Sequence, residues 1–182
     1  MTDRSQALSP VAQKFILHWG EMGTRWGINR TVAQVHALLF LSEKPLPADV
    51  IAETLNIARS NASTSLRELQ NWGIVRLVHV LADRRDHFES MKDVFEMFRV
   101  ITRQRKQWEV DPTVHLLKDC IAEAAKQKRA DRYVRDRLSD LLDFFDVADT
   151  AYAQMERLPT SSLLKLVRMG DKALKLLGIS KT

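Results

Sequence analysis

The first hydrophobic pattern in the chain is a helical stripe over residues 10–23. Proline is well tolerated as the first residue of a helix, so Pro10 marks the start of this segment. The apolar side chains that follow are spaced by four and three residues, which predicts one apolar helix face; they are Val11, Phe15, Trp19 and Met22. The glycines at positions 20, 23 and 27 are expected to weaken this helix and then to end it.

The second segment, TVAQVHALLFLSE at residues 31–43, is apolar over most of its circumference. Asn29 or Thr31 can cap its amino end, because a short polar side chain there accepts a hydrogen bond from a free backbone N–H. Val32, Val35, Leu38, Leu39 and Leu41 form a face wide enough to predict a buried helix. The fragment KPLP, at residues 44–47, then interrupts the helical pattern.

Two further helices are predicted close together. The first, PADVIAETL at residues 47–55, opens with Pro47 and is little more than two turns long. The link NIA joins it to a longer helix, RSNASTSLRELQNWG, which ends at Gly73. Two helices joined by three or four residues, the second longer than the first, form a helix-turn-helix pattern.

The outer face of this longer helix has the composition of a DNA-contacting surface. Ala62, Leu66 and Leu69 are spaced to face the core, which leaves a polar set on the outside: Arg59, Ser60, Asn61, Ser63, Thr64 and Arg67. Neither Asp nor Glu occurs between Thr54 and Arg67. Short hydrogen-bonding side chains bracketed by arginines can approach base edges and phosphates in a major groove. The alternative is a solvated helix surface with Ser and Asn at its N-cap.

A two-stranded hairpin is predicted directly after Gly73. Residues 75–80 alternate, with Val75 and Leu77 on one face, and the pattern resumes at HFES after the fragment ADRRD. Arg84 and Arg85 are therefore expected at the tip of a wing, where they can reach phosphates or enter the adjacent minor groove. The alternative is that they pair with the flanking Asp83 and Asp86 and keep the hairpin soluble.

These segments resemble a known family. The run RSNASTSLRELQNWGIVRLVHVLADRRDHFES, followed by DVFEMFRVITRQRKQWEVDPTVHLL, is similar to the GbsR family of MarR-like winged-helix transcriptional regulators, from about Arg30 to Leu117. The resemblance implies a dimeric repressor with a winged helix and a helical region for dimerisation and ligand response. It assigns recognition-helix roles to Asn61, Ser63, Thr64 and Arg67, and wing roles to Arg84 and Arg85. Members of the family respond to choline or glycine betaine, but their effectors differ, so the resemblance does not assign a ligand.

The rest of the chain is predicted to be helical. Residues 91–108 have a broad apolar face, and Asp111 with Pro112 predicts a break before the next helix. A helix over residues 131–155 carries a row of aspartates that we interpret as a solvated acidic face and not as a metal site. The final segment, SSLLKLVRMGDKALKLL, is basic and amphipathic, which favours packing against a partner subunit over membrane binding.

The expected fold is mainly α with a small two-stranded wing, in which a winged helix-turn-helix is joined to a helical dimerisation region. Three parts are expected. Residues 1–28 form an N-terminal helix for dimerisation, residues 29–90 form the DNA-binding domain, and residues 91–182 form a linking helix with a helical dimerisation and effector region.

Composition restricts the function further. The chain has 182 residues, 45% of them hydrophobic, with a net charge of +5 and a single cysteine, Cys120. An acidic partner is compatible with this charge, and one cysteine excludes an internal disulfide and a cysteine-based zinc cage. The five histidines lack metal-ligand spacing, and the sequence has no phosphate-binding loop or glycine-flanked serine, so we expect neither an enzyme nor a metal or other cofactor. Without a signal peptide or membrane span, a cytoplasmic protein is expected.

The sequence therefore predicts a homodimeric repressor that binds an inverted repeat in double-stranded DNA. The alternative is a winged-helix protein-interaction or architectural module that binds DNA without sequence preference or binds a protein partner. A small-molecule effector is a weaker hypothesis, since aromatic rings can hold a quaternary ammonium group by cation-π attraction. The candidate rings are Trp19, Trp26, Phe95, Phe98 and Trp108, for which core packing is the alternative.

Overall fold

The computed structural model describes residues 8–126, 132–162, 164–165 and 169–170, and the chain divides into two compact units, Met1–Gln104 and Arg105–Thr182. The division falls inside the segment predicted to link the two parts of the protein. Most of the basic amphipathic segment predicted near the C-terminus lies outside the described residues.

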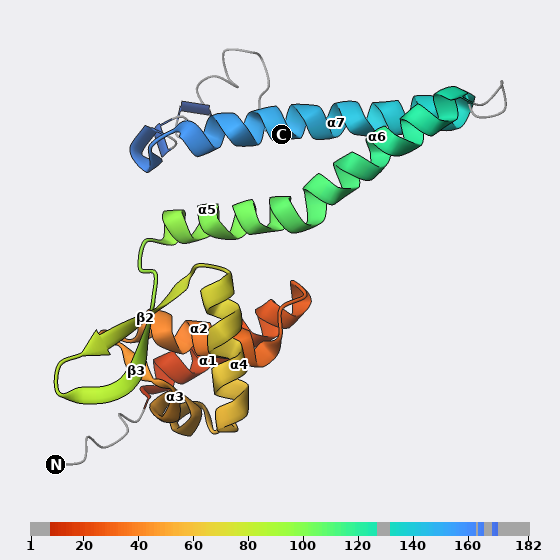
Figure 1. Ribbon diagram of the computed structural model, residues 1–182. Coiled ribbons are helices and arrows are strands. Elements are labelled where there is room, and N and C mark those ends of the chain that lie inside the picture. The colour runs from red at the N-terminus through yellow and green to blue at the C-terminus, as the bar shows by residue number, and fades with distance from the viewer. Residues whose placement is uncertain (1–7, 127–131, 163, 166–168, 171–182) are drawn as a thin grey trace. The chain divides into compact units, whose positions relative to one another are not determined.

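The first unit is a helical domain with a small sheet at one side (Figure 1). In chain order its elements are α1 (Pro10–Arg25), α2 (Arg30–Leu41), β1 (Leu46–Pro47), α3 (Ala48–Leu55), α4 (Arg59–Asn71), β2 (Val75–Val80), β3 (Asp83–Ser90) and α5 (Val94–Arg105). The largest fully buried side chains come from the middle helices and are Val35, Leu39, Ile51, Leu66 and Leu69. The wide apolar face predicted for residues 31–43 thus lies at the centre of the core.

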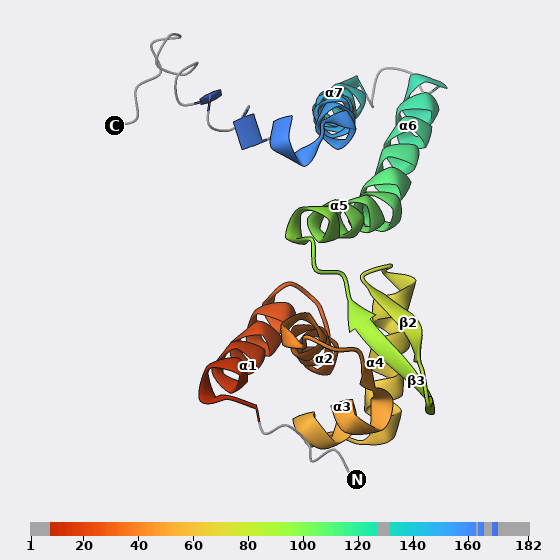
Figure 2. The ribbon, with the colours of Figure 1, turned by 90° about the vertical axis from the view of Figure 1, so that its left-hand side faces the viewer.

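The glycines of α1 do not end the helix as expected. Gly20 and Gly23 are buried inside α1, which runs side by side with α2 (Figure 2). A Cβ atom on Gly23 would lie 2.5 Å from Cβ of Ala33, and one on Gly20 would lie 2.7 Å from Cγ of Gln34. These glycines therefore permit close helix packing. The chain turns only after Arg25, where Gly27 has a φ of +78° that other residues rarely adopt.

The predicted helix-turn-helix is present as α3 and α4. Asn56 ends α3 in the left-handed conformation, with a φ of 51°, and its backbone N–H bonds to Glu53 O and Ala52 O. The link of residues 56–58 then leads into α4, and Gly73 follows this helix with a φ of +75°. The spacing of apolar residues on α4 is also as predicted, because Ala62, Leu66 and Leu69 are buried.

The sheet has three antiparallel strands in the order β1-β3-β2, one strand more than predicted. The unpredicted strand is β1, a two-residue pairing of Leu46 with Phe88 and of Pro47 with His87. It lies in the KPLP fragment, too short and too rich in proline to show a strand pattern. Leu77, expected to face inward, is 38% exposed, and the register of β2 shifts between Val78 and Val80. The fold class, a mainly helical winged helix, is as predicted.

The second unit consists of a π-helical turn, η1 (Lys106–Val110), followed by α6 (Asp111–Lys126) and α7 (Arg132–Arg157). The break expected at Asp111 and Pro112 is absent, because the helix continues from α5 through η1 into α6. The N–H of Asp111 donates to Lys106 O, five residues earlier. This wider turn leaves room for the ring of Pro112, which would clash with the carbonyl four residues back in a regular α-helix.

The aspartates of α7 are partly neutralised by neighbouring cations. Nζ of Lys106 lies 2.9 Å from Oδ1 of Asp149 and 2.7 Å from Oδ1 of Asp111, so one ammonium group joins η1, α6 and α7. Arg137 pairs with Asp140 on α7 itself. Among the described residues no group of His, Cys, Asp and Glu side chains could hold a metal ion, and no described helix is long and apolar enough to cross a membrane.

Candidate nucleic-acid interface

The exposed face of α4 carries the predicted polar set. All six predicted recognition side chains are exposed: Arg59, Ser60, Asn61, Ser63, Thr64 and Arg67. Ser65 differs from its neighbours, because it is buried beside Leu66 on the inner face. No ion pair joins Arg59 or Arg67 to any residue that the structure describes, so both guanidinium groups are available to an anionic partner.

The amino end of α4 is open. Its N-cap residue is Ala58, which has no side chain to accept a hydrogen bond, and its first turn contains no acidic residue. The explanation that Ser60 and Asn61 occur here as N-cap residues therefore does not apply. Unbonded N–H groups and the positive end of the helix dipole attract anions such as phosphate. This end of α4 is therefore suited to contact a phosphate group of the DNA backbone.

The wing turns at Leu81 and Ala82, and Ala82 has a φ of 68°. Val80 pairs with Asp83 across this turn. Arg84 and Arg85 are thus the second and third residues of β3, just beyond the tip where the sequence pattern placed them. Both residues of the tip are exposed, and Leu81 is 98% exposed.

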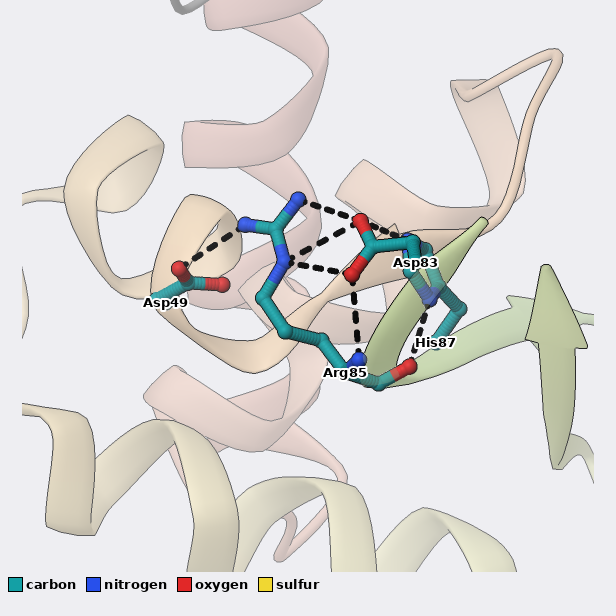
Figure 3. Close-up of polar contacts among 4 residues, drawn as sticks. All are labelled: Asp49, Asp83, Arg85 and His87. Atoms are coloured by element: carbon teal, nitrogen blue, oxygen red, sulfur yellow. Dashed lines mark hydrogen bonds and ion pairs between the residues drawn. The ribbon is translucent and has the colours of Figure 1, made fainter. Parts of the chain in front are cut away.

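Arg85 is the centre of a polar cluster that connects the wing to α3 (Figure 3). Its Nη2 lies 2.6 Å from Oδ2 of Asp83, and its Nη1 lies 3.0 Å from Oδ2 of Asp49. The backbone N–H of Arg85 also donates to Oδ1 of Asp83, at 3.0 Å. The hydrogen bonds from Arg85 hold the pKa of the Asp83 carboxyl well below its usual range, and Asp83 and Asp49 raise the pKa of Arg85.

His87 is the fourth residue of this cluster. Its ring is buried, with Nδ1 2.9 Å from the carbonyl oxygen of Arg85 and Nε2 3.4 Å from Oδ2 of Asp83. The sequence pattern indicated neither His87 nor Asp49 as part of this site. Asp49 is 36 residues before Arg85, and only the folded chain brings the two together.

The two wing arginines therefore differ. Arg85 makes the kind of ion pair that the alternative explanation predicted, although its second partner is Asp49 and not Asp86. Arg84 is exposed, and within the described part of the chain no ion pair or hydrogen bond engages its side chain. Of the pair, Arg84 is the arginine whose charge is available to phosphate.

The five aromatic residues suggested as effector ligands are divided between the two units. Trp19 and Trp26 meet edge to face, with ring centroids 5.8 Å apart. Phe95 and Phe98 are both exposed on α5, and Trp108 belongs to the second unit. Trp19 also stacks on Phe15, its neighbour on the predicted apolar stripe, at 5.4 Å, and lies 6.4 Å from the ring of His36, which the sequence pattern did not indicate.

Comparisons with known proteins agree with this geometry. Residues 26–86, the segment from the end of α1 to the wing, match the model of the MarR family. The HTH-type transcriptional repressor GbsR of Bacillus subtilis (strain 168) is 22% identical over 139 residues, which cover 75% of this chain and 77% of that protein. A solved structure described as a transcriptional regulator matches with a TM-score of 0.63 and 17% identity, over 80% of this chain and 95% of the other. The chain therefore contains a segment that matches the MarR family, and over three quarters of its length it resembles the repressor GbsR of Bacillus subtilis.

Proposed function

We propose that the protein is a homodimeric repressor that binds an inverted-repeat operator through α4 and the wing. The observation that carries this proposal is the exposed face of α4, which has hydrogen-bonding side chains, an uncapped amino end and two arginines that pair with no residue the structure describes. Side chains such as Asn61 and Arg67 can read base edges in a major groove. The open end of α4 and Arg84 are suited to phosphates, which position a protein on the duplex.

Repression, rather than activation, is supported by the relative GbsR, a transcriptional repressor that aligns with three quarters of this chain. A repressor needs no interaction surface beyond its DNA contacts, because occupancy of the operator is sufficient to block transcription. Binding without sequence preference, or binding to a protein partner, is the alternative function for the same fold.

A homodimer is supported by apolar side chains on the surface of α7. Large hydrophobic residues are exposed along one broad stripe of this helix: Tyr133, Val134, Leu141, Phe144, Val147 and Met155. Exposed apolar surface of this extent is typical of a protein interface. Dimers are the commonest soluble oligomers, and a two-fold axis would present two copies of α4 to two half-sites one helical turn apart.

Selection of bound fragments from a random DNA pool tests this function. An inverted repeat among the selected sequences is the expected result. Titration with salt on the selected duplex and on a random duplex then measures specificity, with a ratio of affinities of about 10³ or more expected. Equal affinity for both duplexes would favour the architectural alternative, and no DNA binding at all would favour a protein partner.

We also propose that a small molecule regulates DNA binding. The resemblance to GbsR directs the first test to choline and glycine betaine, added at millimolar concentration during DNA titrations. For either molecule to act, it must bind one arrangement of the recognition helices better than another, because equal affinity for both shifts nothing.

A further inference from the structure

The turn of the wing carries an exposed leucine. Leu81 is 98% exposed, the highest value among the large hydrophobic residues that the structure describes. The hairpin of β2 and β3 projects from the helices of the first unit (Figure 1), and Leu81 with Ala82 forms its turn. Single exposed leucines are common on protein surfaces, so this exposure alone indicates no ligand. The conformation of the turn and the charges beside it are what point to one.

The turn has an unusual composition. Two-residue hairpin turns favour glycine, asparagine or aspartate, because these residues adopt a positive φ at low cost. Here Ala82 has a φ of 68°, a left-handed conformation that is strained for alanine. The wing thus has an exposed leucine and a strained alanine at a turn that Asn-Gly would make more stable. Backbone strain of this kind is concentrated at functional sites.

The accessible charge beside the turn is positive. The carboxylate of Asp83 is occupied by Arg85, whose Nη2 lies 2.6 Å from Oδ2. Asp86 is exposed, but it is three residues further along β3, up to about 10 Å further from the turn at ~3.3 Å per residue. Arg84 is exposed and unpaired within the described residues. Of the Asp, Glu, Lys and Arg side chains, the accessible one nearest to Leu81 along the chain is therefore Arg84, whose charge attracts phosphates.

A protein partner fits this surface poorly. A stable protein interface buries about 800 Å² on each partner, several times the area of one leucine side chain. Val80 is the other large apolar residue beside the turn, and it is only 39% exposed. Proteins that bind in the minor groove of DNA combine basic side chains with an apolar wedge that inserts between base pairs. The tip of this wing has both parts.

The wing is long enough to reach a minor groove. Three residues separate the end of α4 from β2, and the six residues of β2 extend about 20 Å at ~3.3 Å per residue. Along a duplex, the centres of the major groove and of the adjacent minor groove are about half a helical turn apart, or ~17 Å. With α4 in the major groove, the turn of the wing can therefore lie in the minor groove beside it.

We propose that Leu81 inserts into this minor groove and separates two stacked base pairs, which kinks the duplex. The base step that it enters is a pyrimidine–purine step such as TA or CA, because these steps unstack most easily. Arg84 then contacts a neighbouring phosphate. The proposal rests on the proposed function, the binding of DNA through α4 and the wing, and adds a residue that determines specificity there.

Insertion would make specificity depend on the deformability of the operator. Unstacking a base step costs free energy, and burial of the leucine side chain against the bases offsets this cost. The cost is larger at a stiff step, such as AA in an A-tract, than at a flexible one. Leu81 therefore favours one kind of base step without making a hydrogen bond to any base.

The test uses the full-length protein and the operator selected from the random pool. 2-Aminopurine, which fluoresces more strongly when it is unstacked, replaces one adenine at a time. Saturation with the parent protein should raise the fluorescence severalfold at one step of each half-site. Leu81→Ala should remove this rise and weaken binding about tenfold, because the complex no longer buries a leucine side chain. Leu81→Met keeps an apolar side chain of similar size and should retain both the rise and the affinity.

Exchange of the base step separates insertion from a simple surface contact. Replacing the pyrimidine–purine step by AA should weaken parental binding about tenfold, a typical effect of one altered base pair, and should leave the affinity of Leu81→Ala unchanged. Leu17→Ala is the matched control, since Leu17 is a leucine of α1 that is 59% exposed. This variant should behave as the parent does in both measurements.

The proposal is wrong if the parent protein raises the fluorescence at no step, or if Leu81→Ala gives the parental rise. Equal weakening of the parent and of Leu81→Ala by the AA step would also overturn it. These results leave specific DNA binding intact, so they differ from failure of the proposed function, in which selection yields no inverted repeat. In that case the same fluorescence measurement on duplexes with TA steps still tests the insertion.

Discussion

Nη1 of Arg85 in the wing lies 3.0 Å from Oδ2 of Asp49 in the first turn of α3. The same guanidinium group bonds to Asp83 at the start of β3, so it connects the hairpin to the helix-turn-helix. Because its side chain is half exposed, the pair contributes little to stability.

The two wing arginines should differ in their effect on salt dependence. Arg84→Ala removes an unpaired charge and should reduce the slope of log K against log salt by ~0.9, the value for one phosphate contact. Arg85→Ala should change the slope much less, because its charge is already matched by Asp83 and Asp49. Titrations at several salt concentrations, on specific and random duplexes, measure both slopes. Equal reductions of the slope in the two variants would show that Arg85 breaks its ion pairs with Asp83 and Asp49 and contacts DNA.

Arg67→Ala should weaken specific DNA binding by ~1–3 kcal/mol, because Arg67 is the long cationic side chain on the exposed face of α4. The measurement is the affinity for the selected operator, together with a thermal melt to confirm folding. Arg137→Ala, at an exposed position of α7, is the control and should retain parental affinity. A folded Arg67→Ala protein with unchanged affinity would assign this residue to the solvated surface.

Gly23→Ala should lower the free energy of unfolding by ~1–3 kcal/mol, the usual cost of overpacking. The new methyl group would lie 2.5 Å from Cβ of Ala33, so α1 and α2 would have to separate. Adding Ala33→Gly removes the opposing methyl group and should recover part of the loss, apart from the ~1 kcal/mol cost of glycine in a helix. Chemical denaturation of both variants measures the difference, and a double variant no more stable than Gly23→Ala would contradict the packing argument.

Phe144→Asp should convert dimers to monomers if α7 forms the subunit interface. Phe144 is 65% exposed on the apolar stripe of this helix, and a carboxylate there would be buried without a partner in the dimer. Sedimentation velocity gives the oligomeric state, with Thr150→Asp, on a different side of α7, as the control. Deletion of residues 160–182 should have the same effect if the terminal segment contributes. Dimers that persist in both variants would place the interface elsewhere.

His36 should make the protein less stable as the pH falls. Its pKa is about 4 in the folded state and 6.5 ordinarily, so the unfolded chain binds more protons between these values. The contribution of His36 to the free energy of unfolding is fully present above pH 6.5 and is lost progressively toward pH 4. A pKa shift of this size corresponds to about 3 kcal/mol in total. Denaturation curves of the parent and His36→Leu across this range test the effect. His18→Gln, at an exposed site on α1, should follow the parent.

Much of the fold follows from local sequence pattern. The spacing of Ala62, Leu66 and Leu69 determines which side of α4 is buried, and therefore which polar residues are exposed. Asn56 and Gly73 mark helix ends because their left-handed backbone suits only a few residue types. The alternation around ADRRD likewise predicted the hairpin. These features depend on residues a few positions apart, which is the range over which helix and strand periodicity acts.

Tertiary structure alone decided which side chains meet. The two wing arginines are adjacent in sequence, yet within the described part of the chain only Arg85 is paired: Asp83 is its neighbour in the wing, whereas folding brings Asp49 to it from α3. Gly23 permits the close approach of α2, a role that no pattern within α1 reveals. A cavity beside His36 forms where three helices from distant parts of the chain pack imperfectly. Such contacts depend on distances across the folded core, which sequence spacing does not specify.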